Sequence, residues 1–572
     1  MKRLLFLVFV LFIFLFSGCE ILDVLLGLED QEAYQEKEQT VPIKDNVIED
    51  STVYLVKLNN SEQKIEARKT GYVKSIQPRN IDEEEEYCDT DSFIRAQNRK
   101  LSLIAAENAA RSVDSSRAVV PGYNTQKTYD VGDADNFFSY VNIKNNKNIS
   151  ETVIGICKYA GKHCYVFADQ NDSNKIDKGI NLSDTDYKNL GKKFDSCYEL
   201  ETSVLGNPFY TKYNSTYFVP CNEKIIILVS DLFGDANINQ DGGTVGYFYS
   251  GDLFNQAYLD KYYNKSKSSD INSNECEMFY IDSYFLTTRK DTVYSTLVHE
   301  FNHMINYVMK SVNYLTENPN ATSFISCDTW YTEMLSMVTE DLFQHYLSLD
   351  DLDSPKARLP YFNMYYNYGF RLWDQSSNNN SLALVMYANT YAFGAYLVRN
   401  FGGIDLLKAI AQNEYVDEES ITNALQKIYP NVTYVDEKTN KTRKIDYEFV
   451  LRRFYLCLFN TKKPTPAQLK LTGDKQYISF YIQSGSASDN LYFSPIDIMS
   501  IKCDVNNGNG TTSYNQTINP VIYNYNKRVD LGPSGFSVHE IGKKKDVKSF
   551  TLSASNVKGL EYYLITFKEL AE

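Results

Sequence analysis

Histidine is scarce in this sequence, with five residues among 572, and basic residues are outnumbered by acidic ones. The 58 Lys and Arg against 73 Asp and Glu give a net charge of −15. A surface of that sign repels phosphates, which excludes a general nucleic-acid binder. No C-x-x-C pair occurs, so a zinc site built from thiolates is not expected. A metal site in this chain has to come from a small number of residues.

The N-terminus has the features of an export signal. Lys2 and Arg3 precede an apolar run, Leu4–Phe16, of 13 residues. That run is short for a transmembrane helix, which needs about 20 residues. Small residues follow it, ending at Cys19. A charged start, a short apolar core and small residues predict a signal peptide over 1–18.

The Ser-Gly-Cys ending of this segment resembles the lipobox of bacterial lipoproteins, although Phe16 stands where leucine is usual. The resemblance implies that Cys19 carries lipid, palmitate included, and that the exported protein is anchored to a membrane of the cell envelope. A plainly secreted protein or an uncleaved anchor is the alternative. Nine cysteines then remain, and they cannot all pair within one chain.

Patterning along the chain predicts four parts after the signal peptide. They are a polar tether over 19–50, an N-terminal β-rich domain over 51–150, an α+β unit over 151–460 and a C-terminal β-sandwich-like domain over 470–572. STVYLVKLN alternates as a half-buried strand does, and KIIILVSD has the continuous apolar run of a buried strand. The two prolines of TKKPTPAQ mark the last linker.

The segment STLVHEFNHMINYVMK predicts a helix with one chemically distinctive face. His299 and His303 are four residues apart, so their side chains lie one above the other and can bind one zinc ion. Glu300 lies about 100° further around the helix, where it can reach a water beside the metal. Two structural histidines on an ordinary amphipathic helix are the alternative. The apolar face comprises Val293, Leu297, Phe301, Met304 and Val308.

A catalytic zinc site needs a third protein ligand. A third histidine six residues after His303 is absent, because Met309 stands there. The next helical segment, TWYTEMLSMVTEDLF, offers Glu333, which lies 30 residues beyond His303. Glu340 is the rival ligand, and a glutamate on a solvated helix face is the other alternative. The sequence therefore predicts a metal site of His299, His303 and Glu333.

HEFNHMIN followed by WYTEMLSMVTED resembles the hyicolysin family of secreted bacterial zinc metallopeptidases, within the gluzincin group. The likeness extends to DLFGDANINQDGGTVGYF, EMFYIDSYF and YANTYAFGAYLVRNFGG, so it covers roughly 150–450. It implies an α+β fold in which a zincin-like catalytic domain carries the HExxH helix between N-terminal and C-terminal β-rich domains. It also implies a zinc-dependent endopeptidase that acts on protein or peptide substrates.

The resemblance assigns roles residue by residue. Glu300 matches the general base, and Tyr391 in YAFGAYL resembles a Y-x-x-G segment whose tyrosine stabilises the developing oxyanion, with Tyr387 as the alternative. Met337 departs from the pattern, because related enzymes have an aspartate there that supports a zinc histidine. Asn306, one turn past His303, is the candidate substitute for that support.

Three further interpretations stay open. Asp235, Asn237, Asn239 and Asp241 alternate as calcium ligands do, although Gly246 stands where an EF-hand loop has its glutamate. EMFYID or the GTVGYFYS run is the expected strand for binding the substrate backbone. A catalytically inactive binding lipoprotein that keeps the zincin fold is the functional alternative, and the presence of Glu300 favours the enzyme.

Overall fold

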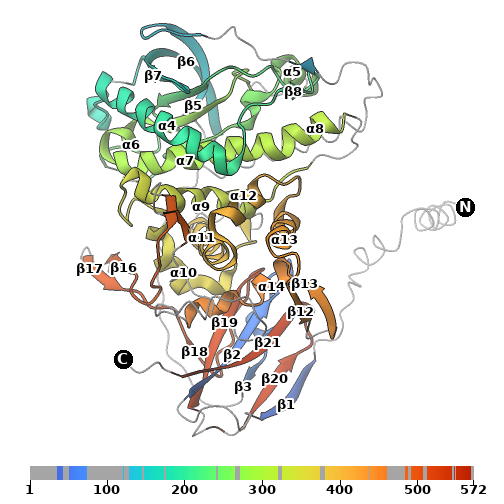
Figure 1. Ribbon diagram of the computed structural model, residues 1–572. Helices are drawn as coiled ribbons and strands as arrows, with labels where there is room; N and C mark the ends of the chain where they lie inside the picture. The colour runs from blue at the N-terminus through green and yellow to red at the C-terminus, as the bar shows by residue number, and fades with distance from the viewer. Residues whose placement is uncertain are drawn as a thin grey trace, which may run out of the picture. The chain divides into compact units, whose positions relative to one another are not determined.

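The computed structural model of the chain divides into two compact units (Figure 1). Unit 1 draws on both ends of the chain, 1–79, 522–531 and 537–572, and unit 2 comprises 80–521 and 532–536. The residues that the structure describes are 35–42, 51–73, 120–121, 128–144, 147–172, 175–239, 242–263, 271–319, 325–373, 381–436, 439–459, 484–486, 491–506, 512–543, 547 and 549–568.

Unit 1 consists of two small sheets whose strands come from opposite ends of the chain. One sheet has the order β1-β20-β3 and the other the order β18-β19-β2-β21. Figure 1 shows the N-terminal strands, in blue, lying among the C-terminal strands, in red. The bounds are β1 (Glu36–Pro42), β2 (Ser51–Asn59), β3 (Tyr72–Val73), β18 (Tyr523–Asn524), β19 (Phe536–Lys543), β20 (Ser549–Ser555) and β21 (Leu560–Lys568).

Strand β2 is buried on both faces, although its sequence alternates like that of a half-buried strand. It lies between β19 and β21, and nine residue pairs join it to β21 in antiparallel register. Lys57 is the residue that breaks the apolar pattern, and its Nζ donates a 2.6 Å hydrogen bond to the carbonyl oxygen of Gly71. Burial lowers the pKa of Lys57 to about 7. The lysine therefore lies inside the unit rather than in water.

The residue ranges of the two units differ from the domain ranges predicted from the sequence. Strands from both predicted β-rich domains, 51–150 and 470–572, combine in unit 1, while 134–160 and 491–521 lie in unit 2. Composition shifts mark linkers but carry no information about which distant strands pair, and this explains the difference.

Unit 2 is built on a six-stranded mixed sheet of order β10-β11-β9-β7-β6-β5. Its three strands β7, β9 and β11 are parallel and the outer pairs are antiparallel. Every residue of β7, β9 and β11 is buried, as continuous apolar runs predict. The bounds are β5 (Ala134–Lys144), β6 (Lys147–Ala160), β7 (Cys164–Asp169), β9 (Ile225–Ser230), β10 (Gly246–Tyr247) and β11 (Met278–Asp282).

Helices supply the rest of unit 2, so the fold is mixed helix and sheet, consistent with α+β. The longer helices are α4 (Asp184–Leu205), α5 (Gln256–Tyr263), α7 (Lys290–Tyr307), α9 (Thr329–Leu347), α11 (Ser381–Phe401), α12 (Gly403–Ala411) and α13 (Asp417–Ile428). The shorter ones are α6 (Ser283–Thr288), α8 (Asn313–Glu317), α10 (Leu359–Tyr365) and α14 (Tyr447–Leu451). Two-stranded ribbons complete the unit: β4 (Val120–Pro121) with β8 (Lys212–Tyr213), β12 (Thr433–Asp436) with β13 (Lys441–Lys444), β14 (Ser484–Ser486) with β15 (Leu491–Phe493), and β16 (Lys502–Asn506) with β17 (Thr512–Thr517).

Two further properties concern the cysteines and the helices of the described residues. The cysteines among them, Cys157, Cys164, Cys197, Cys221, Cys276, Cys327, Cys457 and Cys503, are free thiols. Among these same ranges of the chain, no helix is both long enough and apolar enough to cross a membrane.

Candidate metal centre

Helix α7 carries the HExxH segment and packs its apolar side into unit 2. Leu297, Phe301 and Met304 are each at most 1% exposed, which anchors the helix against the sheet side and against α4. Phe301 makes aromatic contacts with Phe194 and Tyr198 of α4. The other face of α7 is turned toward α9, where the histidines lie.

Helix α9 is buried along nearly its whole length, although it carries polar and acidic residues as well as apolar ones. Glu333 lies in this buried setting, and its side chain is 1% exposed. It therefore does not sit on a solvated helix face. A carboxylate removed from water in this way needs a positive or hydrogen-bonding partner.

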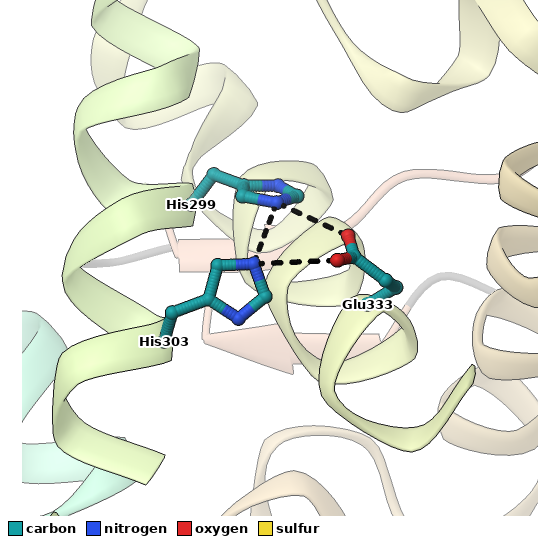
Figure 2. Close-up of side chains that lie close together, drawn as sticks. All are labelled: His299, His303 and Glu333. Carbon is teal, nitrogen blue, oxygen red and sulfur yellow. Dashed lines mark hydrogen bonds and ion pairs between the residues drawn. The ribbon is translucent and has the colours of Figure 1, made fainter. Parts of the chain in front are cut away.

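His299, His303 and Glu333 converge on one point between α7 and α9 (Figure 2). Glu333 Oε2 lies 3.3 Å from His299 Nε2, and Glu333 Oε1 lies 3.6 Å from His303 Nε2. The two Nε2 atoms are 3.0 Å apart. Among the described residues this is the group of His, Cys, Asp or Glu side chains that could hold a metal ion, with one ligand atom from each within 4.8 Å of the others.

The outer nitrogen of each imidazole has its own hydrogen-bond partner on α9. His299 Nδ1 lies 2.7 Å from Glu340 Oε1, and the other oxygen of Glu340 accepts a 2.6 Å hydrogen bond from Ser295. His303 Nδ1 lies 3.3 Å from the hydroxyl of Ser336. Fixing Nδ1 in this way aims Nε2 at the cluster, which is the arrangement that metal-binding histidines use.

The charges around the cluster favour a cation. Burial works against a charged imidazole, yet the carboxylates of Glu340 and Glu333 raise the pKa of His299 well above its ordinary value. Two imidazole nitrogens and a buried carboxylate are also the ligand types that zinc prefers. The residues present therefore fit a divalent metal ion.

Glu300 follows His299 on α7 and is largely buried, at 6% exposed. Its negative charge is among those that raise the pKa of His299, so it lies within electrostatic reach of the cluster. It is not one of the three residues whose ligand atoms converge. This position suits a base beside a metal rather than a ligand to it.

The structure does not bring every predicted site residue to the cluster. Tyr391 is fully buried on α11, and its hydroxyl donates a 3.0 Å hydrogen bond to Asp341, which also forms an ion pair with Arg399. Asn306 Nδ2 lies 3.6 Å from Cys327 Sγ rather than beside an imidazole. The packing of α9 against α7 and α11 decides both placements, and helical spacing within one segment does not specify it.

Two other predicted positions lie partly or wholly outside the described residues. Cys19 and residues 19–34 and 43–50 of the predicted polar tether lie outside the described residues. The part of the tether that is described, Glu36–Pro42, is strand β1, which pairs with β20 in unit 1, so this part belongs to a sheet and is not a tether. In the loop proposed for calcium, Asp241 is likewise outside the described residues, and the carboxylate of Asp235 accepts hydrogen bonds from Thr244. Nothing in this geometry adds support for calcium.

The supporting role of Glu340 was not predicted, since the sequence offered it only as a rival ligand. The contact between Glu340 and His299 results from the antiparallel packing of the two helices. Ser295, His299 and His303 recur every four residues on α7 and face Glu340, Ser336 and Glu333 in reverse order on α9. The register between helices, which sets this pairing, is not visible in the sequence.

A second buried carboxylate, Glu201 of α4, lies near the cluster. It is fully buried, and neither carboxylate oxygen has a hydrogen-bond partner among the described residues. Burial raises the pKa of Glu201 well above its ordinary value, and the charge of His299 opposes this rise. Folding therefore favours the protonated form of Glu201 relative to the unfolded chain.

We expect Glu201→Gln to stabilise the protein at pH 8 by on the order of 1 to 3 kcal/mol. A raised folded-state pKa means that stability falls as pH rises above the ordinary glutamate pKa, so the gain should shrink toward zero near pH 4. Denaturant unfolding at the two pH values measures it. Glu199→Gln, on an exposed part of the same helix, should show no such gain. A loss of stability at pH 8 in Glu201→Gln would show that the carboxylate is ionised and paired.

Comparison with known proteins points to the same chemistry. No protein-family model matches the chain. It is 26% identical over 405 residues to the neutral metalloprotease ShpI of Staphylococcus hyicus, a match that covers 68% of this chain and 75% of that protein. Together with the cluster of His299, His303 and Glu333, this likeness supports a metallopeptidase family for the chain.

Proposed function

We propose that the chain is a zinc-dependent endopeptidase of the gluzincin type. The convergence of His299, His303 and Glu333 is the observation that carries this proposal. The likeness to a neutral metalloprotease supports the reaction class. Zinc is the proposed metal because two imidazoles and one carboxylate leave room for the open coordination position that a catalytic zinc site needs.

The proposed roles divide between the metal and the chain. A bound zinc ion would supply Lewis acidity toward the peptide carbonyl and would acidify water. His299, His303 and Glu333 would hold it, with Glu340 and Ser336 orienting the imidazoles. Glu300 would accept a proton from the attacking water and return it to the leaving nitrogen. Tyr391 is not part of this proposal, because its hydroxyl is engaged by Asp341.

Strand β10 is the proposed binding edge for the substrate backbone. It is one of the two edge strands of the six-stranded sheet, whereas β11 lies in the interior between β9 and β10. A Cβ added at Gly246 would lie 2.9 Å from Thr296 Cγ2, one turn before His299 on α7. A peptide that extends the sheet at β10 would therefore run beside the helix that carries Glu300.

The proposed location is outside the cytoplasm, on a membrane of the cell envelope. The apolar run before Cys19 supports export, and the Ser-Gly-Cys ending supports lipid attachment at Cys19. Protein or peptide substrates at that location are the proposed partners.

The test is metal removal from purified protein. We expect about one zinc ion per chain and cleavage of an internal bond in an N-terminally acetylated peptide, which an aminopeptidase could not start on. Treatment with 1,10-phenanthroline should abolish cleavage, and added Zn²⁺ should restore it after dialysis. A serine-protease inhibitor is the control and should have no effect. Undiminished cleavage in metal-free protein would disprove the proposal.

A further inference from the structure

The C-terminal end of α12 is contacted from the π-helical turn that directly continues α7, the helix that bears the two histidines. Lys310 lies seven residues after His303, and its Nζ reaches three acceptors at this end. They are the carbonyl oxygen of Ile410 at 3.0 Å, that of Asn413 at 2.5 Å and Asn413 Oδ1 at 3.1 Å. A cation at the end of a helix is favoured by the partial negative charge of its last carbonyls.

The same end of α12 is also contacted from the helix that bears Glu333. Tyr331 lies two residues before Glu333, and its hydroxyl lies 2.8 Å from the hydroxyl of Ser420. Ser420 in turn donates a 3.0 Å hydrogen bond to the carbonyl oxygen of Ile410, the oxygen that Lys310 also contacts. We call Ile410, Asn413 and Ser420 the α12 node. Both ligand-bearing helices are thus tied to one small group of atoms.

Two features set Lys310 apart from an ordinary packing residue. It is 1% exposed, and a buried ammonium costs free energy unless its surroundings compensate. Burial lowers the pKa of Lys310 to about 8, and the nearby charges of Cys327 and Asp417 oppose that effect. In addition, α7 gives way to a π-helical turn over Val308–Val312, and Lys310 is at its centre. Such turns occur often at functional sites, where they redirect a side chain.

We propose that the α12 node fixes the position of His303 relative to Glu333. Lys310 and Tyr331 are then positioning residues for the proposed metal ligands. The inference rests on the proposed function, because the cluster has to bind a metal for its alignment to matter. Lys310 is about two helical turns from His303 on the same face, so a shift of this anchor moves the histidine along the axis. Tyr331 acts in the same way on Glu333 from the first turn of α9.

The experiment measures zinc affinity of the purified full chain by competition with a chromophoric chelator. Lys310→Met should weaken zinc binding about 10-fold or more, and Tyr331→Phe should weaken it about 3-fold to 10-fold. The double variant should bind zinc about as weakly as the single variant with the larger loss of affinity, because both changes remove contacts to the same node. The visible spectrum of Co²⁺ added in place of zinc should change with each variant. All measurements are made under conditions in which circular dichroism shows folded protein.

Tyr210→Phe is the matched control. The hydroxyl of this buried tyrosine donates a 2.5 Å hydrogen bond to the carbonyl oxygen of Val219, away from α7 and α9. Its loss should lower stability like that of Tyr331 but leave zinc affinity unchanged. Parental affinity and an unchanged Co²⁺ spectrum in Tyr331→Phe would overturn the inference even if Lys310→Met fails to fold. A parent that binds no zinc would overturn the proposed function itself.

Discussion

Glu300→Gln is expected to lower kcat/KM for peptide cleavage by about 1,000-fold while the protein keeps its metal. Glutamine has nearly the same shape as glutamate but cannot accept a proton at neutral pH, so the change removes the proposed base and little else. His299, His303 and Glu333, the residues that form the candidate metal site in the described part of the chain, are untouched by it. Zinc content and cleavage rate, measured on the same preparation, separate the two effects.

The chain provides a matched control for this variant in its second His-Glu pair. His539 is buried in unit 1, where its ring contacts Ser537 and the carbonyl oxygen of Asn524, and Glu540 beside it is exposed. Glu540→Gln should therefore cleave at the parental rate. If Glu300→Gln also cleaves at that rate, Glu300 is not the base; if it loses its zinc, the residue has a structural role in the site.

Glu333→Ala is expected to remove zinc binding almost completely, whereas Glu340→Ala should weaken it by about 10-fold to 100-fold. Glu333 supplies the carboxylate that converges with both imidazoles, so its removal leaves two ligands. Glu340 contacts the outer nitrogen of His299 and the hydroxyl of Ser295, and it is not one of the three residues whose ligand atoms converge. Its loss frees the ring to rotate but deletes no ligand. Chelator competition on both variants gives the two affinities under one set of conditions.

The reverse ranking would be informative. If Glu340→Ala lost zinc entirely and Glu333→Ala kept it, Glu340 would be the ligand, which is the alternative that the sequence left open. Ser336→Ala, which removes the 3.3 Å partner of His303 Nδ1, serves as the reference for a weaker outer contact.

The sequence predicts the parts of the structure in which the relevant geometry is local. The spacing of His299 and His303 follows from helix periodicity, and the burial of α7 follows from its apolar positions. Glu333 could be predicted as a ligand because a short connection must return α9 alongside α7. The choice between Glu333 and Glu340 needs the register of two packed helices, and no sequence pattern specifies it.

The placements that differ from the sequence-based expectations have the same physical origin. Tyr391 has the expected local motif, but its hydroxyl donates a hydrogen bond to Asp341, which is ion-paired with Arg399, and not to a group at the proposed metal site. For the β strands, the pairing partner is the missing information. Strand β2 has a clear strand pattern, yet its partner β21 lies about 500 residues away along the chain, and such non-local pairing leaves no trace in a single sequence.

The shared sheet of unit 1 has a consequence for proteolytic processing. Both β2 and β3 precede Val120, where the described part of unit 2 begins, and β2 is held by nine residue pairs to β21 near the other end of the chain. One cut between Val73 and Val120 would divide the polypeptide into two fragments, but the smaller fragment would remain as an inner strand of the sheet. A cut in this segment would therefore leave the two fragments joined through the strand pairing of β2 with β21.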